Sequence, residues 1–160
     1  MLKLDIQKFA DEETRNYHVG NGTKLGYSAT ESGTKTYING ITTIPEIGGS
    51  PDEVDTDSLD NMKYHTTIDG LMPAVKLDIE LNMEDPSAEA NIKQVYDLEQ
   101  TGNTYYWFVE YSNGITVSFR SKVKYSFAET TSGELLKFTM HLSAIGEPTT
   151  TIPVTASTGD

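Results

Sequence analysis

Histidines and nucleophilic side chains carry much of enzyme chemistry, and the sequence has few of them in a suggestive arrangement. The three histidines, His18, His65 and His141, are far apart in the sequence, and none has an acidic neighbour at a spacing that indicates a dyad. The sequence has no Gly-x-Ser-x-Gly turn and no phosphate-binding loop. It also has no cysteine, which excludes thiol catalysis, disulfides and iron–sulfur clusters. We therefore predict no catalytic residue.

Carboxylates concentrated between residues 52 and 60 could bind a hard cation, which prefers several oxygen ligands close together in the sequence. The residues are Asp52, Glu53, Asp55, Asp57 and Asp60. They lack the glycine and the distal glutamate of an EF-hand loop. Alternation with Val54 and Thr56 predicts a strand instead, with the acids at 53, 55 and 57 on one face. We predict no metal ion and no cofactor.

The charge of the chain is strongly acidic and unevenly distributed. With 24 acidic and 12 basic residues the net charge is −12, which argues against gripping nucleic acid or an anionic membrane. Residues 36–62 contain no lysine or arginine, whereas residues 111–128 contain no acid and three cations at even positions: Arg120, Lys122 and Lys124. Such cations form one basic stripe on a sheet. They are either ordinary solubilising charge or a surface complementary to acids of a neighbouring copy, and we predict the second.

Alternating apolar and polar residues predict a mainly β protein. The clearest strand is residues 75–81, and strands are also expected at residues 36–44, 104–111 and 136–142. A thirteen-residue strand is expected at 115–127, after a hairpin turn at Asn113-Gly114. Strands of that length with one apolar and one polar face exceed what one small core usually needs.

One helix is expected at residues 86–100. Asp85-Pro86-Ser87 offers capping residues and a proline for its first turn, and Gly102 suits a left-handed C-cap. Its few apolar residues make one packing face, so the helix is expected to lie on a sheet.

We expect three regions: an extended N-terminal arm at residues 1–35, a folded domain at 36–147 and a flexible C-terminal tail at 148–160. A long connection at 59–73 interrupts the domain. It has more apolar residues than a loop facing only water should have. These are Leu59, Met62, Tyr64, Ile68, Leu71 and Met72, which we predict to contact an adjacent subunit. No segment resembles a secretion signal or a membrane span, so we expect the chain to stay where it is made or assembles.

Two segments carry a family resemblance: the run Ile41-Thr-Thr-Ile-Pro-Glu-Ile-Gly-Gly-Ser-Pro-Asp-Glu-Val-Asp-Thr-Asp-Ser-Leu-Asp60, and Ile68-Asp-Gly-Leu71. They resemble the major tail (tube) proteins of long non-contractile-tailed bacteriophages. The predicted order of strands and helix is similar to that family over residues 36–145.

The resemblance implies a β-sandwich or barrel flanked by one helix. It also implies that six copies close into a ring, and that rings stack into the tail tube of a virion after synthesis in the host bacterial cytoplasm. Implied partners are further copies of the chain and the tape-measure, tail-tip and tail-terminator proteins. DNA would pass through the tube without specific binding, and no membrane is involved.

In such a tube, an acidic inner wall would repel the phosphate backbone of DNA. We therefore predict five lumen-facing acids: Glu53, Asp55, Asp57, Asp78 and Glu80.

Two alternatives come from other classes. A carbohydrate-binding or adhesin β-sandwich could present a sugar-stacking platform made of Tyr105, Tyr106, Trp107 and Tyr111. The tube protein of a contractile injection machine would share the sheets and the helix.

Overall fold

Two antiparallel sheets pack against each other in a β-sandwich with one helix, which confirms the predicted fold class. The computed structural model describes residues 20–58 and 64–154. Sheet A has five strands in the order β11 (Ile145–Thr151), β8 (Thr116–Ser121), β7 (Tyr105–Glu110), β1 (Lys24–Ser28) and β2 (Thr36–Ile38). Sheet B has four in the order β3 (Ile41–Thr43), β6 (Lys76–Asn82), β10 (Lys137–Ser143) and β9 (Val123–Phe127).

The core lies between the two sheets and is built by the alternation seen in the sequence. In β6, Leu77, Ile79 and Leu81 are buried while the intervening residues face outward. The buried alternate residues of β10 are Phe138, Met140 and Leu142. Sheet A contributes Leu25, Trp107 and Phe119 to the same core. Burying these side chains is the main favourable contribution to folding.

Two segments predicted as single strands are divided between the sheets. The expected strand at 36–44 consists of β2 in sheet A and β3 in sheet B, separated at Gly40, whose φ is +82°. A Cβ at Gly40 would lie 2.6 Å from Asn91 Nδ2, so this crossing needs glycine. The expected strand at 115–127 consists of β8 and β9, which meet at Lys122. Its odd positions through Tyr125 stay on the core side in both sheets, because the chain turns from one sheet to the other without losing its alternation, whereas Phe127 at the end of β9 is exposed.

The helix α1 (Asn91–Thr101) ends at Gly102 in the left-handed conformation, as predicted, but begins five residues later than expected. Its first N–H groups are satisfied by the Glu84 carboxylate, which accepts from Asn91 N, and by Asn91 Oδ1, which accepts from Ile92 N. Pro86 and Ser87 therefore lie in the turn before the helix. Val95 and Leu98 join the core.

The predicted arm and tail both overlap the sandwich. Leu25 of β1 is fully buried, and β1 pairs with β7 and β2, so residues 24–35 belong to the domain rather than to an arm. At the other end, β11 pairs with β8 through Thr151, four residues into the predicted tail. Turn-forming residues around β1 masked its strand pattern in the sequence. Residues 1–19 and 155–160 lie outside the described chain.

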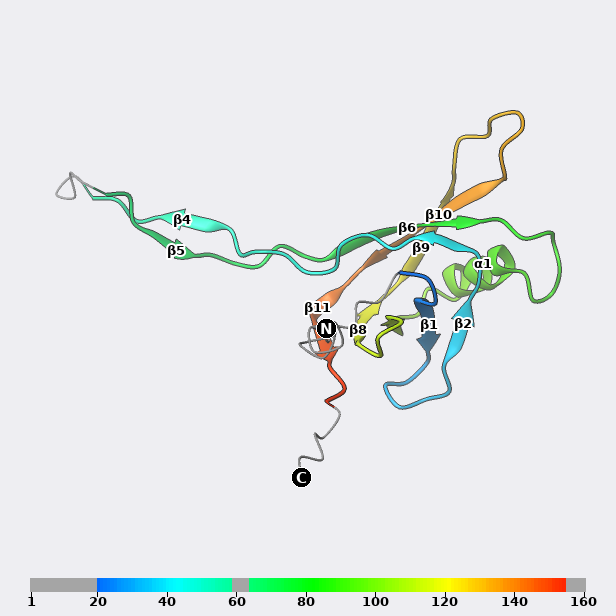
Figure 1. The fold of residues 1–160 in the computed structure, drawn as a ribbon, viewed down its shortest axis with the longest axis horizontal. Coiled ribbons are helices and arrows are strands. Elements are labelled where there is room, and N and C mark those ends of the chain that lie inside the picture. The colour runs from blue at the N-terminus through cyan, green and yellow to red at the C-terminus, as the bar shows by residue number, and fades with distance from the viewer. Residues whose placement is uncertain (1–19, 59–63, 155–160) are drawn as a thin grey trace, which may run out of the picture.

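Residues between β3 and β6 form a long two-stranded projection that extends away from the sandwich (Figure 1). Its paired strands are β4 (Glu53–Asp55) and β5 (Thr67–Asp69). We call the described residues 45–58 and 64–75 the projecting hairpin. No helix within the described ranges is long and apolar enough to cross a membrane.

Candidate interaction surfaces

The projecting hairpin has one acidic face and one apolar face, set by its register. Glu53 is directly opposite Asp69 and Asp55 is opposite Thr67, while Val54 and Ile68 pair on the other face. Val54 is 48% exposed and Ile68 58% exposed. Like charges directly opposite each other destabilise a strand pair, and an isolated two-stranded ribbon is marginally stable in water. The hairpin therefore has both the charge and the apolar surface to bind a partner.

Four of the six predicted subunit-bridging residues lie on the described part of this hairpin, and all four are exposed. Tyr64 and Leu71 are 80% and 89% exposed, and Ile68 and Met72 are also exposed. Leu59 and Met62 lie outside the described residues. Val54 has the same character but was not predicted, although the alternation that placed the acids on one face also placed Val54 on the other.

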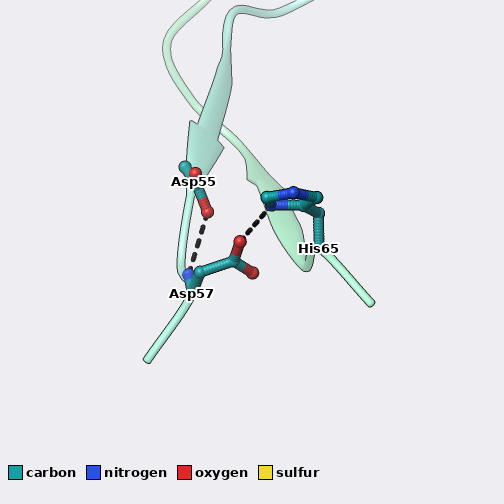
Figure 2. A group of neighbouring side chains, drawn as sticks. All are labelled: Asp55, Asp57 and His65. Carbon is teal, nitrogen blue, oxygen red and sulfur yellow. Dashed lines mark hydrogen bonds and ion pairs between the residues drawn. The ribbon is translucent and has the colours of Figure 1, made fainter. Parts of the chain in front are cut away.

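Near its distal end the hairpin holds an ion-pair cluster of Asp55, Asp57 and His65 (Figure 2). The Asp57 carboxylate pairs with His65 Nδ1 and also accepts a hydrogen bond from Thr66 N at 2.7 Å. Asp57 N donates to Asp55 Oδ1 at 2.9 Å. These three side chains could each offer a ligand atom to a cation, but the bonds already present hold the two chains of the hairpin together. The sequence spacing does not indicate this pair, because Asp57 and His65 meet only through the pairing of the two hairpin strands.

A second acid–histidine pair lies on the polar face of sheet B. His141 Nδ1 is 2.6 Å from Asp78 Oδ1, and His141 Nε2 is 2.8 Å from Ser126 Oγ. The three side chains come from adjacent strands β6, β10 and β9, where sequence spacing gave no sign of contact. The side chains are ordered as in a Ser-His-Asp triad. However, the Asp78 carboxylate is exposed. The surrounding backbone N–H groups belong to the strand pairing of sheet B, so they do not form an oxyanion hole. We interpret these contacts as polar interactions that link the three neighbouring strands of sheet B.

Glu80, on the same face, forms an ion pair with Lys137 at 2.7 Å. The hydrogen bond from Lys137 lowers the pKa of Glu80, and the same contact raises the pKa of Lys137. Asp78 and Glu80 thus share a polar face with compensating charges and are not part of an unbroken acidic surface. Glu53, Asp55 and Asp57 are on the projecting hairpin, away from β6, so the chain does not bring the five predicted lumen acids together (Figure 1).

The predicted basic stripe is divided by the change of sheet at Lys122. Arg120 is on β8 in sheet A, where its guanidinium lies over the Tyr106 ring with 5.6 Å to the centroid. Lys124 is on β9 in sheet B, opposite His141. Lys76 lies at the same end of sheet B, paired with Ser143, whose N–H donates to Ser121 Oγ next to Lys122. We call Lys76, Lys122 and Lys124 the basic end of sheet B.

The aromatic residues proposed as a sugar platform do not form one. Trp107 is fully buried, and its Nε1 donates to Ser121 O at 3.2 Å. Tyr27 packs against Trp107 and Tyr105 inside the sandwich. A stacking platform needs its central ring at the surface, so this reading of the sequence is wrong.

No protein-family model and no curated protein matches the sequence. Solved structures do match the fold. A chain from the tail of an empty gene transfer agent particle with C6 symmetry aligns with a TM-score of 0.65 and 15% identity, covering 85% of this chain and 100% of that one. The SPP1 tail tube protein aligns with a TM-score of 0.55 and 11% identity, covering 83% and 78%.

The chain has the fold of tail tube proteins. This fold also occurs in contractile machines: a chain from the sheath/tube terminator of an extracellular contractile injection system, PVC, aligns with a TM-score of 0.59 and 9% identity over 86% of this chain and 99% of that one. The fold therefore agrees with the resemblance in the sequence, and it does not distinguish contractile from non-contractile tails.

Proposed function

We propose that this protein is the structural subunit of a phage tail tube and has no enzymatic activity. The observation that carries the proposal is the match of 85% of the chain to a whole chain from a gene transfer agent tail. The exposed projecting hairpin gives separate support, because beyond Ile47 and Val75 at its base none of its described side chains packs on the sandwich core.

Six copies close into a ring by joining their sheet B edges. β3 and β9 are the two edge strands of sheet B, and an edge strand presents unpaired backbone groups to another chain. The C6 symmetry of the similar gene transfer agent tail supports the number six. In such a ring the polar face of sheet B, with Asp78 and Glu80, lines the channel through which DNA passes without specific binding.

Rings stack into the tube of a virion, and the hairpin residues Tyr64, Ile68, Leu71 and Met72 contact adjacent subunits. Tape-measure, tail-tip and tail-terminator proteins complete the tail, and assembly follows synthesis in the bacterial cytoplasm. A tube of a contractile machine is the second candidate, favoured by the matching terminator chain.

Negative-stain electron microscopy of the purified protein at rising concentration tests the proposal. Rings and stacked tubes are expected for the natural chain. A variant in which a short Gly-Ser turn replaces residues 46–73 should remain a folded monomer. A natural chain that stays monomeric at millimolar concentration, even with tail-tip proteins added, would contradict the tube.

A further inference from the structure

The described part of the projecting hairpin carries an excess of acidic side chains. Its described residues include six carboxylates and no lysine or arginine: Glu46, Asp52, Glu53, Asp55, Asp57 and Asp69. All six are exposed, and Glu53 lies directly opposite Asp69. Of these six carboxylates, His65 contacts that of Asp57. The acidic face of β4 and β5 therefore remains without a cation inside the described chain.

The basic end of sheet B has the opposite deficiency. Lys76, Lys122 and Lys124 are exposed, and none forms an ion pair with any described residue. Three other described lysines have acidic partners: Lys35 pairs with Glu110, Lys93 with Asp97 and Lys137 with Glu80. The basic end thus gathers cations that form no ion pair with the described residues of the same copy.

The two surfaces have one spacing in common, the step of two residues along a strand. Residues two apart on a strand are about 7 Å apart, and directly opposed residues on neighbouring strands are about 5 Å apart. Glu53, Asp55 and Asp69 therefore form a triangle of carboxylates with sides of this size. Lys122 and Lys124 are likewise two residues apart, and Lys76 lies across β10 from them. Surfaces of opposite charge favour one orientation of association over others.

We propose that the acidic face of the projecting hairpin of one copy docks on the basic end of sheet B of a second copy. The hairpin points away from the sandwich of its own copy, so the contact is between copies (Figure 1). This inference rests on the proposed function only in requiring self-association. The basic surface in this proposal differs from the stripe predicted from the sequence, because it includes Lys76 and does not include Arg120. An acidic hairpin at the end of sheet B leaves the central part of the polar face open.

Site-directed cross-linking tests the contact, because the natural chain has no cysteine. Asp55→Cys is placed in an affinity-tagged copy and Lys122→Cys in an untagged copy, and the mixture is treated with a short bis-maleimide. The matched control replaces Lys122→Cys with Lys24→Cys, an exposed lysine on β1 of sheet A. We expect a tagged–untagged product several-fold more abundant for Lys122 than for Lys24, and reduced at high salt.

A charge exchange provides a second readout. Glu53, Asp55 and Asp69 changed together to Lys should abolish association, and Lys76, Lys122 and Lys124 changed together to Glu should do the same. The chain carrying both sets should recover it, with circular dichroism confirming that every variant is folded.

The outcomes separate the two proposals. Rings in the microscope with no excess of the Lys122 product over the Lys24 product would overturn the docking contact and leave the tube in place. The Lys122 product without rings would support the contact and contradict the tube. Failure of the double exchange to recover association, in folded protein, would also overturn the contact.

Discussion

The sandwich and the projecting hairpin use the same alternation of residues for opposite purposes. In β6 and β10 every second side chain is buried and its neighbours face water. In β4 and β5 every residue is exposed on both faces. The alternation in the sandwich strands is therefore explained within one copy, because burying their apolar faces stabilises the fold. In the hairpin no such burial occurs in β4 and β5, and the proposed contacts with a second copy would account for its apolar and acidic faces.

The largest effect expected from this contrast is at Trp107, in the centre of sheet A. Trp107→Ala removes a fully buried ring and the hydrogen bond to Ser121 O. Such truncations cost about 3–5 kcal/mol of the free energy of unfolding. Urea denaturation followed by circular dichroism measures the loss. A loss below about 1 kcal/mol would mean that the sandwich core is not organised around this residue.

The next largest loss of stability is expected at Asn91, whose side chain links the crossing between the sheets to the start of α1. Its buried amide donates to Asn39 O at 2.9 Å and to Asn82 O at 2.7 Å, and its Oδ1 accepts from Glu84 N. Asn91→Ala leaves these backbone groups without partners, which should cost about 2 kcal/mol. Asn103→Ala, just beyond the other end of the helix and exposed, is the control and should change little. Equal effects of the two changes would show that the amide does not hold the crossing.

Much of the sandwich could be predicted from the sequence because alternation reports which side of a strand faces the core. The strand at 75–81 is predicted correctly on that basis, whereas the turn at Asn113-Gly114 and the C-cap at Gly102 are predicted correctly from their glycines. Alternation does not report which sheet a strand joins. It continues unbroken through Lys122, so β8 and β9 were read as one strand.

The interaction surfaces were harder to predict because their residues meet only in three dimensions. Asp78, Ser126 and His141 come from three strands, and the register that joins them is set by long-range pairing. The division of Arg120 from Lys124 follows from the same change of sheet that the pattern concealed. The acids of β4, by contrast, were correctly placed on one face, because that depends only on a local period of two.

A smaller effect on the free energy of unfolding is expected at a surface ion pair of the sandwich, that of Lys35 with Glu110. Lys35 donates to Glu110 at 2.7 Å, and this hydrogen bond lowers the pKa of Glu110. A lowered pKa stabilises the fold above the ordinary glutamate pKa, and the contribution is lost as the pH falls through the lowered value. Glu110→Gln should therefore cost about 0.5 kcal/mol at neutral pH and almost nothing near pH 3.

Chemical denaturation at several pH values measures this difference. Glu31→Gln, which has no ion pair among the described residues, should show no such trend. A cost for Glu110→Gln that grows as the pH falls would have the wrong sign and would contradict the role of the ion pair.

The smallest effect on folding, and the sharpest test of the contrast, is expected in the hairpin. Val54→Thr and Ile68→Thr together replace its central apolar pair and keep the branched side chains that strands favour. Because both residues are exposed, the free energy of unfolding should change by less than about 0.5 kcal/mol. Association should weaken nevertheless, because in the proposed tube this surface is buried between copies, and sedimentation velocity would show rings shifting to monomers. Val154→Thr, exposed near the end of the described chain, is the control. A large loss of stability would make the hairpin part of the fold, whereas unchanged rings would show that its apolar face is not where the copies touch.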